Sequence, residues 1–248
     1  MILDPWFYAL AIPAVASQGL AKGGFAGVGA LAMPMLALAI DPVQAAAILL
    51  PILIVQDVVG VWAFRRTFDA HVLAWMLPGA AAGIALGYWF ASMVPPSAVL
   101  AAVGGISMLF GAWRLWTERH GVPVASASPG WVGSLFGMLS GVTSQIAHAG
   151  QPPFQLWVLP RRLPRDVLVG TTAIYFCAVN WLKVPAYVAL GQFTRENLTT
   201  AATLLPVAIA STFAGVWLVR RVSAERFYRV IYWLMIAVGA KLVWDGVG

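Results

Sequence analysis

Cysteine and charge are both scarce in this sequence. Cys177 is the only cysteine among 248 residues, which excludes an intrachain disulfide and a metal site built from several cysteines. Charged residues make up 10% of the chain, whereas roughly a quarter of the residues of an ordinary soluble domain are charged. No Lys or Arg precedes Lys22, so the basic region of a cleavable signal peptide is absent and we expect this end to stay in the mature chain.

Hydrophobic residues are abundant instead. They form 61% of the chain, and the mean hydropathy is +0.84. Continuous apolar runs of about 20 residues, the length that spans a bilayer as a helix, cover most of the sequence. They lie at 42–64, 71–91, 97–116, 165–190, 194–219 and 224–244. Because these runs do not alternate as barrel strands would, they predict an all-α integral membrane protein surrounded by lipid.

The formal net charge of +6 raises the question of a nucleic-acid partner. In a membrane protein the surplus has a simpler origin, because Lys and Arg flank the spans on the cytoplasmic side. We therefore expect no nucleic-acid partner, and no cofactor or metal site.

The two halves of the chain share a weak but ordered pattern. One set of residues recurs 122 positions later and a second set 128 positions later, the change of offset falling near "ALGQFTREN". The matched pairs are Gly19 and Gly141, Pro42 and Pro164, Gly87 and Gly215, Trp89 and Trp217, Gly111 and Gly239, and Trp116 and Trp244. This predicts two repeats, 1–121 and 122–248, within one membrane domain.

Each predicted repeat begins with an apolar stretch that is interrupted. The stretch 6–40 contains "KGGFAGVG", here called the first break (22–29), and the stretch 131–160 contains "SQIAHAGQPP", the second break (144–153). If each stretch crosses the membrane once, the repeats are parallel. If each folds back as a re-entrant hairpin, the repeats are inverted.

The distribution of positive charge favours the hairpins. With single crossings, the cations divide almost evenly between the two sides. With hairpins, eleven arginines share one side: Arg65, Arg66, Arg114, Arg119, Arg161, Arg162, Arg165, Arg220, Arg221, Arg226 and Arg229. Only Arg195 and Lys241 then lie opposite, so the arginine-rich side is predicted to be cytoplasmic and both termini outside.

Inverted repeats with discontinuous helices are typical of secondary transporters, whose substrate site forms where the breaks meet near the midplane. Gly23 and Gly24 permit a tight reversal at the first break. At the second break, Gly150 precedes two prolines suited to the first turn of a returning helix. A helix that restarts there presents unpaired N–H groups, which favour an anion.

Two lysines lie within the predicted bilayer, where ionisable groups are functional candidates. Lys22 is at the first break, and Lys183 lies inside the run 165–190, three residues after Asn180. Two lysines without a matching excess of carboxylates suggest a bound anion. The alternative for Lys183 is that its ammonium group reaches up to the membrane interface.

Other polar residues near the breaks complete the candidate site. Ser144, Gln145 and His148 are expected to contact the substrate, although a lone histidine is more often structural. Asp57 aligns with Asn180 at an offset of 123, and it either neutralises a lysine or carries a proton, as His148 also could.

Two motifs resemble a known family. "GLAKGGFAGVGALAMPML" resembles the first-repeat motif of the TauE/SafE sulfite exporter family, also called the toluene sulfonate uptake permease family. "TSQIAHAGQPPFQLWVLPRRLPRDVLVGTTAIYF" is similar to the second-repeat motif of one branch, except that Gln151 stands where relatives usually have glycine. The resemblance implies a bacterial inner-membrane carrier of sulfite, sulfonates or related sulfur or carboxylate anions.

The leading hypothesis is therefore an anion transporter, most simply an exporter, and not an enzyme. The alternative is an intramembrane serine hydrolase in which Ser140 and His148 are nucleophile and base, although Gly-x-x-Ser-Gly is not a nucleophile elbow. A scaffold would not need two buried lysines. The exact anion, the coupling ion, the direction in the cell and the oligomeric state, a homo-oligomer included, stay open.

Overall fold

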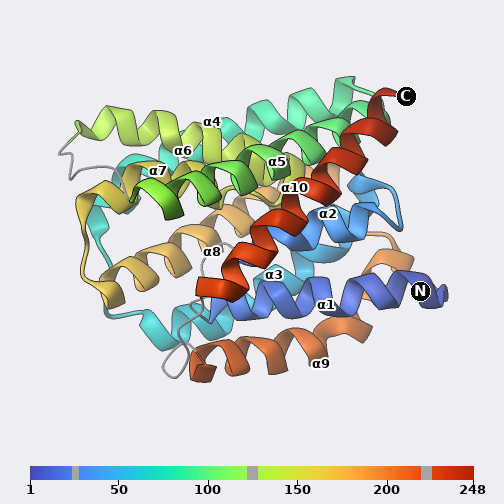
Figure 1. The fold of residues 1–248 in the computed structure, drawn as a ribbon, viewed down its shortest axis with the longest axis horizontal. Helices are drawn as coiled ribbons and strands as arrows, with labels where there is room; N and C mark the ends of the chain where they lie inside the picture. The colour runs from blue at the N-terminus through green and yellow to red at the C-terminus, as the bar shows by residue number, and fades with distance from the viewer. Residues whose placement is uncertain (24–27, 122–127, 219–224) are drawn as a thin grey trace.

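The computed structural model describes residues 1–23, 28–121, 128–218 and 225–248, and every regular element in this part of the chain is helical (Figure 1). The first half contains α1 (Pro5–Lys22), η1 (Val28–Leu31), α2 (Ala32–Ala37), α3 (Pro42–Phe64), α4 (Ala70–Met93) and α5 (Pro96–His120). The second half contains α6 (Gly130–Ala147), α7 (Gln151–Val158), η2 (Leu159–Arg161), α8 (Arg165–Ala189), α9 (Arg195–Leu218) and α10 (Glu225–Val247).

Six helices in the described part are long and apolar enough to cross a membrane, which confirms the six spans expected from hydropathy. They are α3, α4, α5, α8, α9 and α10. The bounds of α3 coincide with the predicted run, whereas α5 continues past residue 116 to His120. The additional residues form a polar last turn that includes Arg119 and His120, and a hydropathy run does not record such a turn.

Aspartate side chains begin three of the helices. Asp41 accepts hydrogen bonds from Val43 N at 2.8 Å and Gln44 N at 3.3 Å, and Pro42 occupies the first turn of α3. Asp4 caps α1 and Asp69 caps α4 in the same way. Such caps satisfy backbone N–H groups that have no partner within the helix.

The helices pack in close pairs. α4 lies against α6, α9 against α1 and α10 against α5, while α3 is central and contacts both α8 and α9. Gly83 of α4 touches the backbone of α6 so closely that a Cβ there would overlap the Met138 carbonyl oxygen. Small residues allow this approach between helices in membranes.

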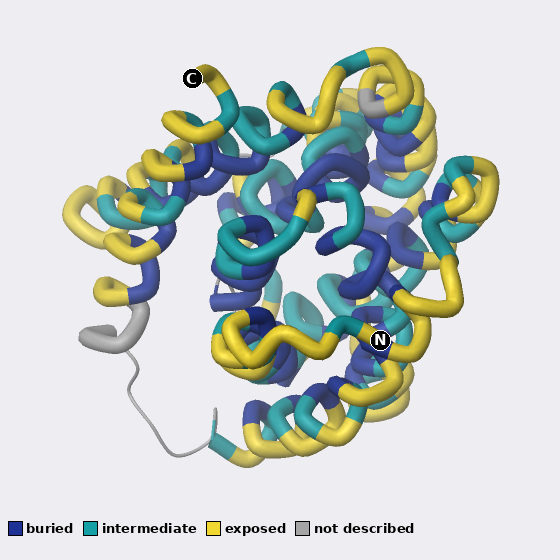
Figure 2. Tube along the Cα trace, turned by 90° about the vertical axis from the view of Figure 1, so that its right-hand side faces the viewer, coloured by how far each residue is buried: buried dark blue, intermediate teal, exposed yellow. Residues whose placement is uncertain are grey.

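The outer surface is strongly apolar. Figure 2 shows exposed residues along the outward faces of the helices and buried residues towards the centre. Exposed tryptophans lie near several helix ends: Trp6, Trp62, Trp89, Trp116, Trp131 and Trp244. An apolar surface with tryptophans of this kind suits a bilayer with aromatic residues at its two interfaces.

Both termini lie at one end of the long axis in Figure 1. The connection from α3 to α4 and the connection from η2 to α8 lie at the other end. The first contains Arg65 and Arg66, and the second contains Arg162. The arginines of these two connections are therefore remote from the chain ends.

Candidate functional site

The first break follows α1, which ends at Lys22. Gly23 packs against the backbone of Gly215 in α9, where a Cβ would not fit. Gly24 lies outside the described residues. The chain resumes at η1 and packs back on α1, with Gly29 beside the Gln18 side chain. Glycine at positions 23 and 29 thus allows the close approaches on which this turn depends.

The second break joins α6 to α7. His148 ends α6 in the left-handed conformation, with φ 49° and ψ 24°, and its N–H donates to Ser144 O at 3.1 Å. The hydroxyl of Ser140 donates to Gly150 O at 2.7 Å. α7 then packs back on α6, and prolines occupy its first turn as the sequence predicted.

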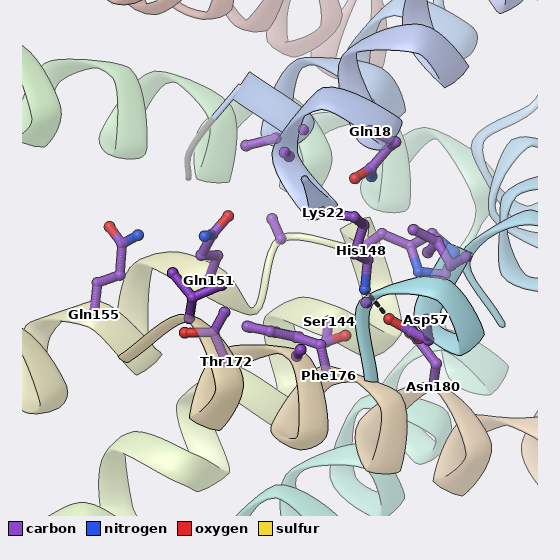
Figure 3. A pocket seen from close by; sticks show the side chains of 18 of the residues that line it. Gln18, Lys22, Asp57, Ser144, His148, Gln151, Gln155, Thr172, Phe176 and Asn180 are labelled. Carbon is purple, nitrogen blue, oxygen red and sulfur yellow. Dashed lines mark hydrogen bonds and ion pairs between the residues drawn. The ribbon is translucent and has the colours of Figure 1, made fainter. Parts of the chain in front are cut away.

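A cavity of about 300 Å³ lies where the two breaks meet (Figure 3). Lys22 and Gly29 contribute from the first break, and His148, Ala149 and Gln151 from the second. The walls are mainly apolar, as is usual for small-molecule sites. The other polar lining residues are Gln18, Asp57, Arg114, Ser144, Gln155, Thr172 and Asn180.

Lys22 forms an ion pair with Asp57 on one wall of this cavity. The second carboxylate oxygen of Asp57 accepts a hydrogen bond of 2.7 Å from the amide of Asn180. Asp57 is 1% exposed, and the ring of Phe176 lies 5.8 Å from the Lys22 ammonium. The buried carboxylate is thus satisfied by one charged and one neutral donor, and it compensates the charge of Lys22.

Lys183 does not line the cavity but lies directly behind it. Its side chain is fully buried and donates to the Ser144 hydroxyl at 3.2 Å and to His148 Nδ1 at 2.7 Å. His148 Nε2 lies 2.9 Å from the carbonyl oxygen of Ala46. Because that oxygen only accepts, Nε2 must carry the proton and Nδ1 must accept from Lys183. Lys183 therefore holds the orientation of a histidine that does face the cavity.

Arg114 is the main residue that sequence reasoning missed. The charge pattern of the sequence groups it with the arginines that set the topology, yet it lines the cavity from α5. Its Nε donates to the Tyr232 hydroxyl at 2.9 Å, and Nη1 donates to Gln155 Oε1 at 3.4 Å. A signal was available, because Arg114 falls inside the predicted span 97–116 and a charge within a span is a functional candidate.

The other expected site residues fall into two groups. Lys22, Ser144, His148 and Asn180 line the cavity, and so does Asp57. Three expected contacts, Gly23, Gln145 and Gly150, shape the breaks but are not among the lining residues. Gln145 lies in the last turn of α6, where its carbonyl oxygen accepts from the Tyr187 hydroxyl at 3.3 Å.

The pair proposed for a hydrolase is not assembled among these residues. The Ser140 hydroxyl donates to Gly150 O, and both ring nitrogens of His148 face Lys183 and Ala46. Nothing in this geometry supports a nucleophile activated by a base. The described residues also contain no group of His, Cys, Asp or Glu side chains placed to hold a metal ion.

Comparison with known families now identifies the chain. The model of the family described as "Sulfite exporter TauE/SafE" matches residues 11–242. The chain belongs to this family. Comparison with curated proteins and with solved structures gives no match. Membership makes the chain a multi-pass membrane transporter of the class that carries sulfur anions such as sulfite, and not an enzyme.

Proposed function

We propose that this TauE/SafE protein exports sulfite, an organosulfonate or a related sulfur or carboxylate anion across a bacterial inner membrane. The substrate binds near the midplane, in the cavity between the two breaks. The single observation that carries the proposal is that residues from both interrupted segments line one cavity with two cations and one carboxylate. An excess of positive charge inside a membrane protein favours a bound anion.

The helix packing supports two inverted repeats. If α1–α5 correspond in order to α6–α10, then the contact of α4 with α6 corresponds to the contact of α9 with α1. The pairs α3 with α8 and α5 with α10 correspond to themselves. A pseudo-two-fold axis produces this reciprocity, and such an axis in the membrane plane is the arrangement of many transporters.

The membrane potential also favours export. An anion leaves the cell down an inside-negative potential, whichever way a passive carrier is oriented. Moving one negative charge outward gains about 2.3 kcal/mol per 100 mV, which corresponds to roughly fiftyfold accumulation outside. Export therefore needs no coupling ion, whereas uptake would need one, with Asp57 and His148 as the groups that could carry a proton.

Flux from proteoliposomes tests this function. Vesicles containing the protein are loaded with sulfite, methanesulfonate or acetate, and efflux is followed while a potassium gradient with valinomycin sets the voltage. We expect saturable efflux of at least one sulfur anion that accelerates when the vesicle interior is negative. Protein-free vesicles, and vesicles with an unrelated membrane protein, provide the background. Efflux equal to that background for every anion would refute the proposal.

A further inference from the structure

The two cations that line the cavity differ in how their charge is balanced. Lys22 is paired with Asp57, so together they add no net charge to the site. Arg114 has no carboxylate within ion-pairing distance among the described residues, since its hydrogen bonds there go to the phenol of Tyr232 and the amide of Gln155. The positive charge that remains for a substrate in the cavity therefore belongs to Arg114.

The guanidinium of Arg114 is held in a fixed position. Nε is bound to the Tyr232 hydroxyl, and the guanidinium carbon lies 5.2 Å from the centre of the Tyr232 ring and 5.8 Å from that of Trp113. Gln155 accepts one N–H of Nη1. An arginine has five N–H donors, so the two N–H groups of Nη2 and the second of Nη1 have no partner among the described residues.

The N–H groups of Nη1 and Nη2 left unpaired in the described part of the chain match one kind of chemical group, an oxyanion. Two parallel N–H donors on a planar cation match two oxygens of one oxyanion group, which a lysine ammonium cannot do. Sulfite and sulfonates present three equivalent oxygens on sulfur. Partial occupation by Tyr232 and Gln155 orients the guanidinium without neutralising it.

Arg114 lies at the opposite end of the cavity from the Lys22 and Asp57 ion pair. It lies in the last two turns of α5, the helix that ends near Arg119. Gln155, its partner, lies apart from the group formed by Lys22, Asp57 and Asn180 in Figure 3. The cavity thus has, at one end, a cation with no paired carboxylate among the described residues, and at the other a compensated ion pair.

We propose that Arg114 is the residue that selects the substrate, binding two oxygens of its oxyanion group through Nη1 and Nη2, with Tyr232 as its positioning residue. This rests on the proposed transport function and goes further, because it assigns selection to a residue of α5 and not to the lysines. In the proposed orientation the anion meets Arg114 from the cytoplasmic side before it reaches Lys22.

The test compares Arg114→Lys with Arg119→Lys, a matched change of an exposed residue on the same helix that does not line the cavity. KM and maximal flux are measured in proteoliposomes for sulfite, methanesulfonate and iodide, an anion without oxygen atoms. We expect the KM of both oxyanions to rise roughly tenfold or more in Arg114→Lys, with little change for iodide or in Arg119→Lys. A residue that only sets topology or stability would not alter this selectivity.

A second variant keeps the test decisive if Arg114→Lys does not fold. Tyr232→Phe keeps the buried ring but removes the hydroxyl that holds Nε, and we expect a rise in oxyanion KM of roughly threefold with the same selectivity. If Arg114→Lys folds, unchanged oxyanion KM values overturn the proposal. If it does not fold, unchanged KM values in Tyr232→Phe overturn it. If the unaltered protein transports an anion, the proposed function stands even when the role of Arg114 is overturned. If the unaltered protein transports no anion, the proposed function and the role of Arg114 are both refuted.

Discussion

The amide of Asn180 donates to Asp57 across 2.7 Å, although the two residues lie 123 positions apart in the chain. Asp57 also binds Lys22, so this carboxylate connects α1, α3 and α8 at the wall of the cavity. The residue aligned with Asp57 by the predicted duplication is thus its hydrogen-bond partner in space. A carboxylate and an amide at corresponding positions leave the site less negative than two carboxylates would.

Substitutions of Lys22 and Asp57 should have coupled effects on the free energy of unfolding. Lys22→Met leaves the carboxylate of Asp57, 1% exposed, with only Asn180 as a donor. We expect the free energy of unfolding to fall by about 3 kcal/mol, because a buried charge loses its counter-ion. The double variant Lys22→Met with Asp57→Asn should regain most of this loss. Thermal unfolding in detergent gives the comparison, and a double variant no more stable than Lys22→Met would contradict the role assigned to the pair.

Lys183 should matter for transport without touching the substrate. Lys183→Met removes the donor to His148 Nδ1 and to the Ser144 hydroxyl, so the second break loses its fixed geometry. We expect maximal flux to fall roughly tenfold, the effect of losing the buried hydrogen bonds that orient His148 and Ser144, with the amount of folded protein retained.

Lys241→Met is the matched control for that variant. Lys241 is exposed and pairs with Asp245 one turn away on α10, so its removal should leave flux unchanged. Flux in Lys183→Met equal to that of the control would show that the second break keeps its geometry without the lysine.

The close contact of α4 with α6 should be intolerant of added volume. A Cβ at Gly141 would overlap the carbonyl oxygen of Ala80, and backbone cannot move aside as a flexible side chain can. We expect Gly141→Ala to cost about 1–3 kcal/mol in unfolding free energy. At Gly105 no heavy atom lies within 4 Å of the added Cβ, so Gly105→Ala should be neutral or stabilise by about 0.5 kcal/mol. Equal thermal stability of the two variants would contradict this account of the contact.

The two termini should lie on the same side of the membrane, opposite the connection 65–69. Both chain ends lie at the same end of the long axis in Figure 1, and the proposed orientation places them outside the cell. Epitope tags at either end should be digested by protease in intact spheroplasts, and a tag inserted after Arg66 should be protected until the cells are lysed. Protection of both terminal tags would reverse the orientation, and protection of one alone would refute the inverted arrangement.

Much of this structure was predictable from the sequence because it depends on local properties. About twenty apolar residues are sufficient to form a spanning helix, so the extent of α3 followed from the hydropathy of the sequence and from Asp41 and Pro42 at its start. The second break was predictable because Gly150 and two following prolines interrupt one helix and suit the first turn of the next, whereas the left-handed conformation of His148 is seen only in the structure. The family also followed from the sequence, since its motifs lie at these two interruptions.

The partners of the buried charges were decided only by tertiary structure. The sequence predicts that Lys183 contacts the substrate, whereas the packing of α8 puts it behind His148, outside the residues that line the cavity. The charge pattern of the sequence makes Arg114 a topology determinant, whereas the contact of α5 with α10 brings its guanidinium to Tyr232 and the cavity. The reason is that hydropathy records whether a residue lies in the membrane, while the direction of a charged side chain depends on how helices from distant parts of the chain rotate against one another.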